Sequence, residues 1–205
     1  MYNVNRMIMK KLLLLALLVA SAGSAFAQKV SPDSVKIYPE NTSGIVSFVF
    51  QTKNSPDAAF NNAKQWVAKN FKDYKQVVQM EDAVSHALVF KGIQPIGRYN
   101  GVSGGFSTVY NLALEYTATV ECKDSKFRIK MEDLKPKGSF SLGGGKDTPI
   151  FLLFSDIDNI EEERKNSKLD KAYFTMMESM IPGTKETIAA IVSSMAQSIS
   201  YYDDF

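Results

Sequence analysis

One long run of alternating residues constrains the fold of this chain more than any other feature. Residues 108–122 read TVYNLALEYTATVEC, with apolar side chains at every second position over most of the run. Successive side chains of a β-strand point to opposite faces of a sheet, so the run predicts one long strand with one buried face and one solvated face. The side chains predicted to face inward are Tyr110, Leu112, Leu114, Tyr116, Ala118, Val120 and Cys122.

The neighbouring segments supply partners for this strand. Residues 127–134 (FRIKMEDL) alternate in the same way and predict an adjacent strand. Three shorter segments also have the composition of strands, namely residues 44–51 (GIVSFVFQ), 75–81 (KQVVQME) and 86–92 (HALVFKG). Residues 92–105 (GIQPIGRYNGVSGG) are rich in glycine, which predicts a long loop before the central strand.

The stretch SPDAAFNNAKQWVAKNFK, residues 55–72, predicts a helix that carries the only tryptophan of the chain. Ser55 is a suitable N-cap, and Pro56 suits the first helical position. Trp66 lies at the border of an apolar stripe, so we expect it to be a core or boundary residue at the edge of the sheet. The alternative is that Trp66 anchors a binding partner. The stripe itself consists of Phe60, Ala63, Val67 and Phe71.

The order strand, helix, four strands, helix predicts an α+β protein with a single curved antiparallel sheet and helices on one face. Helical spacing near the C-terminus predicts one helix over residues 168–180 and a second that Thr184 caps, with the sequence IPGT between them. The expected organisation is a signal peptide over residues 1–27, a polar arm over 28–42, a β-α-β4 core over 43–134, a flexible loop region over 135–168, and a helical segment over 169–205 that packs on the sheet.

The first residues have the features of a secretory signal. Lys10 and Lys11 precede an apolar run over residues 12–20, and Ala25 and Ala27 suit a cleavage site before Gln28. The start codon can be that of Met1 or of Met9. The apolar run is short for a membrane span, so we expect no stable membrane anchor after cleavage, and a periplasmic or otherwise exported protein.

Cleavage would leave a chain without excess positive charge. Residues 1–27 carry three of the 24 basic side chains and none of the 22 acidic ones, so the remainder has 21 basic and 22 acidic side chains and a net charge of −1. The predicted solvent face of the sheet carries both signs, at Arg128 and Lys130 and at Glu115, Glu121 and Glu132. We therefore expect no nucleic-acid partner.

Several segments resemble a known family. These are FNNAKQWVAKNFK, VVQMED, FKG and YTATVECKDSKFRIKMEDL, within residues 43–134. Together they resemble the secreted bacterial domain-of-unknown-function family 4468, which has a TBP-like (TATA-box-binding-protein-like) fold. The resemblance implies that fold and a location in the bacterial envelope. It implies no activity, and it carries no functional residues over to this chain.

Motifs with a defined chemistry are incomplete. The sequence GGGK at residues 143–146 has Phe140 and Asp147 where a phosphate-binding loop needs glycine and a hydroxyl residue. One histidine and one cysteine do not suffice for a multi-histidine or cysteine-cluster metal site. With Phe90 opposite Thr108 across the predicted loop, His86 and Cys122 would lie about 33 Å apart at about 3.3 Å per residue. The run DIDNIEEE, residues 156–163, lacks the glycine and terminal glutamate of a calcium loop.

These observations predict no catalytic residue, no cofactor and no metal. Cys122 is expected to be an inert core thiol, and Trp66 is the one candidate for partner binding. The function that fits best is an exported, non-enzymatic binding or interaction module, whose partner is an unidentified protein or small ligand of the envelope. The alternative is a hydrolase-type enzyme whose site is assembled from dispersed carboxylate, tyrosine and serine side chains.

Overall fold

The computed structural model describes residues 29–41, 43–166 and 170–201, and the predicted signal peptide lies outside these ranges. A six-stranded antiparallel sheet has the order β1-β5-β4-β3-β2, and β6 pairs with β5. The strands are β1 (Val46–Gln51), β2 (Val78–Asp82), β3 (Ala87–Ser103), β4 (Phe106–Lys123), β5 (Lys126–Leu142) and β6 (Thr148–Phe151). The expected α+β class with one curved antiparallel sheet is confirmed.

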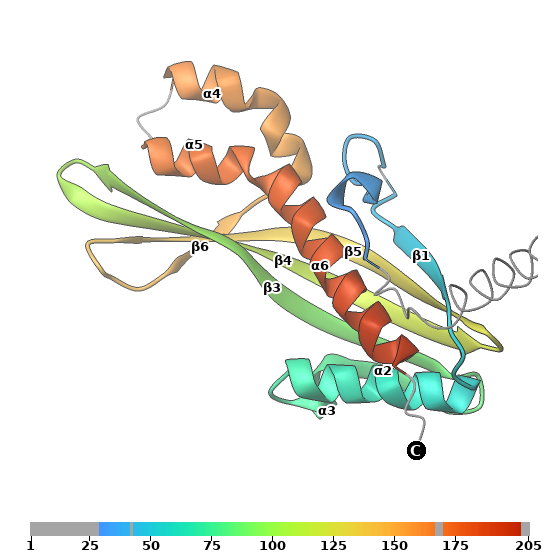
Figure 1. The fold of residues 1–205 in the computed structure, drawn as a ribbon. Helices are drawn as coiled ribbons and strands as arrows, with labels where there is room; N and C mark the ends of the chain where they lie inside the picture. The colour runs from blue at the N-terminus through green and yellow to red at the C-terminus, as the bar shows by residue number, and fades with distance from the viewer. Residues whose placement is uncertain (1–28, 42, 167–169, 202–205) are drawn as a thin grey trace, which may run out of the picture.

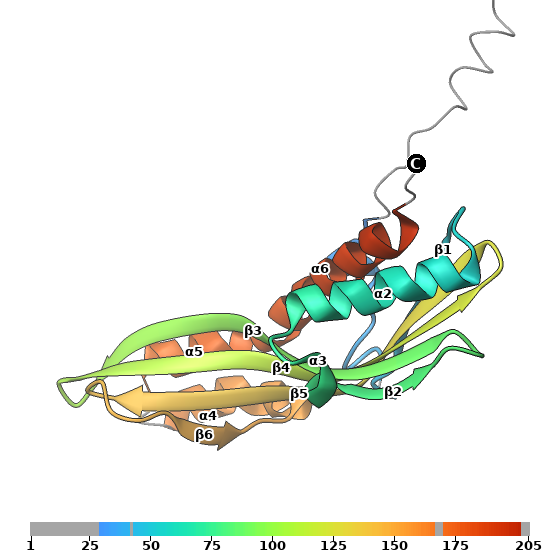
Figure 2. The same ribbon diagram turned by 90° about the horizontal axis from the view of Figure 1, so that it is seen from below.

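Helices and 3-10 turns complete the fold. They are η1 (Pro32–Ser34), α2 (Pro56–Asn70), α3 (Tyr74–Val77), η2 (Phe154–Asn159), α4 (Ile160–Asn166), α5 (Lys171–Glu178) and α6 (Met180–Ser200). Figures 1 and 2 show α2 and α6 over one end of the sheet and α4 and α5 over the other. In the described ranges, no helix is both long enough and apolar enough to cross a membrane.

Helix α2 begins where the sequence predicts. The Ser55 hydroxyl accepts a hydrogen bond from the Ala58 N–H at 3.2 Å, and Pro56 is the first helical residue. An N-cap of this kind satisfies one of the free N–H groups at the start of a helix. The cap fixes the start of α2 and therefore the face that the helix turns to the sheet.

Strand β4 is the centre of the sheet. Its even-numbered residues from Thr108 to Cys122 are all buried, while the odd-numbered positions, apart from Thr117, are partly exposed. The predicted alternation is therefore confirmed over the whole run, and it identifies the face that carries the helices.

The predicted loop over residues 92–105 is wrong. These residues belong to β3, which is 17 residues long, and only Gly104 and Gly105 form the turn to β4. The predicted register between β3 and β4 is therefore also wrong: Phe90 pairs with Ala118 and not with Thr108. Glycine in this segment does not mark a loop. At Gly92 an added Cβ would lie 2.5 Å from Cζ and Oη of Tyr116, so this glycine makes room for a ring of the neighbouring strand.

The described part of the predicted flexible loop over 135–168, residues 135–166, is also not a loop throughout. Strand β5 continues to Leu142, and β6 returns along it with Lys137 opposite Phe151. The segments η2 and α4 follow. Side chains from this region, among them Leu152 and Ile160, pack into a second hydrophobic cluster.

Both neighbours of β4 contain a bulge opposite the middle part of that strand. In β3, Pro95 pairs with Ala113 and Gly97 with Leu112, so Ile96 is an extra residue. In β5, residues 133–134 are opposite Tyr116 alone, and Asp133 has a positive φ of 53°. A bulge bends a strand and reverses which of its side chains face the core. The hydrophobic interior is correspondingly divided into two clusters, and Ile96 packs against both.

The C-terminal helices differ from prediction in one detail. The helical structure is interrupted at Ser179, between α5 and α6, and the sequence IPGT lies inside the first turns of α6. Thr184, predicted as an N-cap, is instead a fully buried helical residue whose hydroxyl has no hydrogen-bond partner in the described structure. Proline is tolerated at this place because the N–H groups of a first helical turn have no partner within the helix.

Candidate functional site

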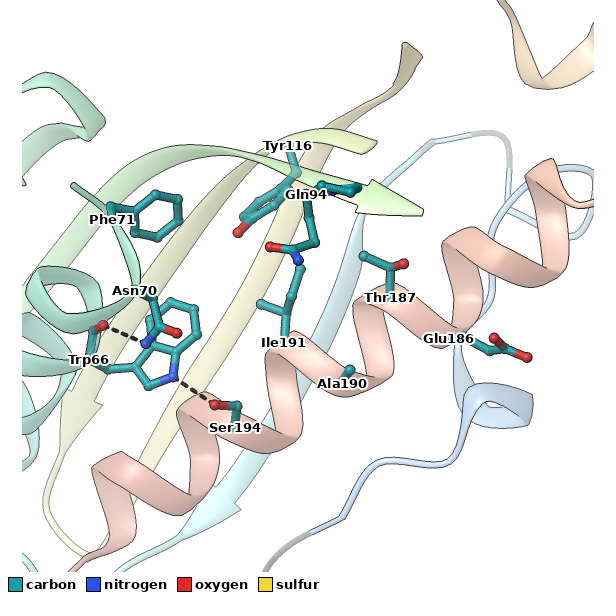
Figure 3. A pocket seen from close by; sticks show the side chains of 11 residues that line it. Trp66, Asn70, Phe71, Gln94, Tyr116, Glu186, Thr187, Ala190, Ile191 and Ser194 are labelled. Atoms are coloured by element: carbon teal, nitrogen blue, oxygen red, sulfur yellow. Dashed lines mark hydrogen bonds between the residues drawn. The ribbon is translucent and has the colours of Figure 1, made fainter. Parts of the chain in front are cut away.

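A cavity of about 430 Å³ lies between the end of α2, the middle of β3 and β4, and the middle of α6. Figure 3 shows its walls: Trp66, Asn70 and Phe71 on one side, Tyr116 and Gln94 above, and the side chains of α6 opposite. From α6 come Glu186, Thr187, Ala190, Ile191 and Ser194. The cavity has the size of a typical small-molecule site.

Trp66 forms part of the core and part of the cavity wall. Its side chain is 6% exposed, and its ring centroid lies 6.0 Å from that of Phe90 and 6.2 Å from that of Phe71. The indole Nε1–H donates to the Ser194 hydroxyl at 2.9 Å. A buried tryptophan normally needs such a partner for its N–H. The bond fixes α2 to α6 beside the cavity.

Tyr116 is the polar group of greatest interest at this cavity. The residue is only 1% exposed, and burial raises the pKa of its hydroxyl above the ordinary value. The hydroxyl therefore stays protonated at neutral pH. No described residue forms a hydrogen bond with it. The hydroxyl is not among the enclosed polar atoms without a partner, so it is open to the cavity, where it can donate a hydrogen bond to an acceptor group of a ligand.

The remaining polar groups lie around the rim. Asn70 donates to the Trp66 carbonyl at 2.8 Å, which leaves its amide oxygen available. Figure 3 shows Gln94 directed toward α6 and Glu186 directed away from the tyrosine. Among the lining residues Glu186 is the single acid, and none carries a positive charge. This lining favours an uncharged occupant over an anion.

The structure changes the relation between His86 and Cys122. With the register of β3 corrected, the Cys122 N–H donates to the His86 carbonyl at 3.0 Å, so the predicted wide separation is wrong. Their side chains nevertheless have different surroundings and do not form a catalytic pair. The His86 imidazole Nε2 lies 2.9 Å from Asp57 Oδ1. Cys122 is 2% exposed, and burial raises the pKa of its thiol to about 12. A thiol with such a pKa is a poor nucleophile at neutral pH.

The carboxylates of DIDNIEEE do not converge. Asp156 caps η2 by accepting from the Leu153 N–H at 2.7 Å, and Asp158 accepts from the Tyr38 hydroxyl. In the described part of the chain, no group of three or more histidine, cysteine, aspartate or glutamate side chains is placed to hold a metal ion.

The open face of the sheet carries ion pairs. Arg128 pairs with Glu121, Lys130 with Glu132 at 2.9 Å, and Lys137 with Glu115 at 3.2 Å. The mixed charge that the sequence predicts for this face is therefore present. Phosphate groups would have to compete with carboxylates that are already paired with these cations.

Residues 48–137 match a known family, described as a domain of unknown function (DUF4468) with TBP-like fold. This span runs from β1 to the middle of β5 and contains both bulges. Residues 48–137 belong to this family. The cavity lies at the boundary of the DUF4468 domain, because Trp66, Gln94 and Tyr116 come from the domain and the opposite wall comes from α6.

Two solved structures are similar to a larger part of the chain. A DUF4468 family protein from Bacteroides ovatus ATCC 8483 is 13% identical, with a TM-score of 0.49, and the alignment covers 89% of this chain and 99% of that one. A TBP-like protein from Parabacteroides distasonis ATCC 8503 is also 13% identical, with a TM-score of 0.44 and coverage of 75% and 92%. A search of the curated proteins finds no significant match. The family assignment rests on the sequence match over residues 48–137.

Sequence reasoning named one residue of this cavity, Trp66, and missed the others. Tyr116 was predicted to face inward, but a strand pattern does not distinguish a packed tyrosine from one that lines a cavity. Gln94 and Pro95 fell in the predicted loop. The α6 residues lie about 120 residues further along the chain, as the separation of 128 between Trp66 and Ser194 illustrates. No signal in a single sequence joins such distant segments.

Proposed function

We propose that this protein is an exported, non-enzymatic binding module, and that the cavity beside Trp66 and Tyr116 holds a small uncharged ligand. The observation that carries the proposal is the Tyr116 hydroxyl, which belongs to a buried residue, has no partner among the described residues and opens to a cavity of about 430 Å³. Preformed cavities with a few directed polar groups are the usual form of small-molecule sites.

Export is supported by the sequence of residues 1–27. A positive segment, a short apolar run and small residues before Gln28 are the three parts of a secretory signal. A protein exported in this way would find its ligand or partner in the periplasm or in another compartment of the envelope.

The chemistry of the lining defines the class of ligand. The Tyr116 hydroxyl can donate to a hydrogen-bond acceptor, such as a carbonyl or ether oxygen. Trp66 and Phe71 provide apolar surface, and Asn70 and Gln94 can bond to hydroxyl or amide groups at the rim. An uncharged molecule with an acceptor at one end and an apolar body satisfies all of these groups.

The ligand can be sought with a library of uncharged fragments that contain carbonyl or ether oxygens. Binding is followed by NMR and by the fluorescence of Trp66, which is the only tryptophan. We expect fragments to bind the wild-type protein and to bind Tyr116→Phe several-fold more weakly, because one hydrogen bond is worth about 0.5–1.5 kcal/mol. Ala190→Trp, which places a large side chain at the exposed wall of the cavity, should abolish binding.

Tyr110→Phe is the matched control for this experiment. Tyr110 lies on the same strand and faces the same side, but it does not line the cavity. Fragments should bind Tyr110→Phe as they bind the wild type. The proposal fails if Tyr116→Phe and Ala190→Trp retain the same fragments with the same affinities as the wild-type protein.

The hydrolase alternative receives less support from this cavity. A serine or threonine nucleophile needs an adjacent base, and Ser194 accepts the Trp66 N–H instead. Glu186 is the single carboxylate in the described lining, so the paired carboxylates of glycoside chemistry are not assembled here.

A further inference from the structure

The outer half of β3 is an uncovered sheet edge. Strand β2 pairs with β3 only from Ala87 to Phe90, whereas the pairing of β3 with β4 continues to Ser103. Beyond the bulge at Ile96, no described strand lies on the outer side of β3. An unpaired edge presents backbone N–H and C=O groups that can hydrogen-bond to another extended chain.

The turn between β3 and β4 determines which backbone groups are free. Gly104 and Gly105 both have positive φ, of 58° and 85°, as in a two-residue type I′ turn. In such a hairpin the closing pair, Ser103 and Phe106, exchanges both hydrogen bonds, and bonded pairs then alternate with non-bonded pairs. Gly101 and Tyr99 are therefore bonded to β4.

The alternation leaves Arg98, Asn100 and Val102 with both backbone groups directed away from β4. The hydrogen bonding of β4 is consistent with this alternation. Ser107, which pairs with Val102, uses its carbonyl to accept from the Gly143 N–H at 2.7 Å, on the other side of β4. No described residue forms a hydrogen bond with the outward backbone groups of Arg98, Asn100 and Val102.

A groove runs beside this edge. It has a volume of about 520 Å³, with β3 on one side and the start of α5 on the other. The lining residues are Tyr99, Asn100, Gly101, Val102, Asp170, Lys171, Ala172 and Thr175. At Gly101 an added Cβ would lie 2.7 Å from Asp170 Oδ2 and 2.8 Å from Ala172 Cβ, so strand and helix approach closely on the inner side of the groove. An edge strand with a helix alongside is the arrangement that accepts a peptide by strand addition.

The free charge beside the groove is positive. Asp170 is engaged, because its carboxylate accepts from the Tyr173 N–H at 3.0 Å and from the Thr108 hydroxyl. Arg98 and Lys171 form no ion pair with any described residue. Arg98 and Val102 lie on the open face of the sheet, where Val102 is 67% exposed, and Lys171 lies on the helix side of the groove. A strand laid along β3 would thus meet two cations and an apolar side chain.

We propose that the edge of β3 from Arg98 to Val102 binds an extended, acidic segment of a partner protein as an additional strand. The outward backbone groups of Arg98, Asn100 and Val102 pair with the partner's backbone. Carboxylates of the partner lie near Arg98 and Lys171, and its apolar side chains lie beside Val102 and over Ala172. The bulge at Ile96 and the turn at Gly104 limit the added strand to a short segment.

This site is separate from the cavity beside Trp66. The cavity binds a small ligand between α2 and α6, whereas the β3 edge binds a polypeptide beside α5. The proposal therefore does not depend on the occupant of the cavity, and each can fail without the other.

The test uses the octapeptide TVEVTEVT, acetylated and amidated, whose two glutamates lie on opposite faces of an extended strand, with a control peptide in which both glutamates are lysine. Binding is followed by NMR, together with hydrogen exchange of individual amides. In the free protein the amides of Arg98, Asn100 and Val102 should exchange rapidly, and those of Tyr99 and Gly101 slowly. The glutamate peptide should protect the first three amides and leave the other two unchanged.

Variants distinguish backbone pairing from a general attraction of charges. Asn100→Pro removes an outward N–H and should abolish binding; an edge strand tolerates proline at such a position. Asn100→Ala keeps the N–H and should bind the peptide as the wild type does. Arg98→Glu and Lys171→Glu should each weaken the glutamate peptide about tenfold and favour the lysine peptide. Lys123→Glu, at the opposite end of the sheet, should have no effect.

Three results would overturn the proposal. One is the absence of any amide shift with the glutamate peptide at millimolar concentration. Another is equal binding by Asn100→Pro and Asn100→Ala. The third is protection of the Arg98, Asn100 and Val102 amides in the protein alone; sedimentation would then show whether a second copy of the chain occupies the edge.

Discussion

The contact between Gly92 and Tyr116 connects local backbone structure to the candidate site. The two residues are cross-strand partners on β3 and β4, and the tyrosine ring covers the glycine backbone. Glycine weakens an isolated strand, but here it leaves the space that the ring occupies. The position of the Tyr116 hydroxyl at the cavity thus depends on a residue that has no side chain.

Gly92→Ala should therefore destabilise the protein by about 1–3 kcal/mol, because the new methyl group would overlap the Tyr116 ring. Urea denaturation measures the change. In a Tyr116→Leu background the ring is gone, and the same glycine substitution should cost much less. An equal cost in both backgrounds would contradict the steric explanation.

Cys122 gives the stability of the protein a dependence on alkaline pH. Burial raises the pKa of the folded thiol from 9.0 to about 12, so the unfolded chain loses its thiol proton first as the pH rises. The stabilisation is complete below pH 9 and decreases between pH 9 and pH 12, with a limiting slope of about 1.4 kcal/mol per pH unit.

Denaturation of the wild type and of Cys122→Ala over this pH range isolates the contribution of the thiol, since the tyrosines titrate in both proteins. We expect the difference in stability between the two proteins to shrink as the pH rises. Rapid labelling of native Cys122 by a thiol reagent at neutral pH would show that the side chain is not buried.

At the level of elements, the sequence predicted those whose pattern is continuous. The long run of β4 and the capped stripe of α2 are both present, because each keeps one periodicity from end to end. Strand β3 was predicted only up to Gly92. Beyond Ile96 the inward side chains change from even to odd positions. The bulge therefore interrupts the alternating pattern from which a strand is predicted.

The bulge also determines how closely α6 approaches the sheet. An added Cβ at Gly183, in the first turns of α6, would collide with Cγ2 of Ile96. Alanine is otherwise the better helix former by about 1 kcal/mol, so a loss of stability in Gly183→Ala would reveal the collision. We expect Gly183→Ala to cost about 1–3 kcal/mol in wild-type protein.

A double-mutant cycle with Ile96→Ala tests this contact directly. That change removes Cγ2, so Gly183→Ala should become neutral or stabilising in the double variant. Additive effects of the two substitutions would mean that α6 and the bulge do not limit each other.

Across the whole molecule, the two functional candidates occupy different ends of one sheet. The cavity lies between α2 and α6, and the groove lies between β3 and α5. The sequence predicted the sheet, the covered face and the burial of Trp66 and Cys122. It did not predict the cavity or the groove. Each is formed by segments that lie about 70 or more residues apart in the chain, such as β3 and α5.

Export concerns the complete chain. We expect the protein isolated from the envelope of the cells that make it to begin at Gln28, with residues 1–27 removed. Intact-mass measurement after cell fractionation tests the cleavage and the location together. A cytoplasmic protein that retains residues 12–20 would show that the signal prediction is wrong.

The two ends of the described chain are attached to the same half of the fold. The Val30 N–H donates to Ser193 in α6 at 2.8 Å, and Asn54 bonds the carbonyls of Ile199 and Tyr201, where α6 ends. A mechanical load between these ends would therefore act on α6 and on the segments bonded to it. The half of the sheet beyond Ile96 lies outside these segments, so a chain held under tension could present an undistorted β3 edge.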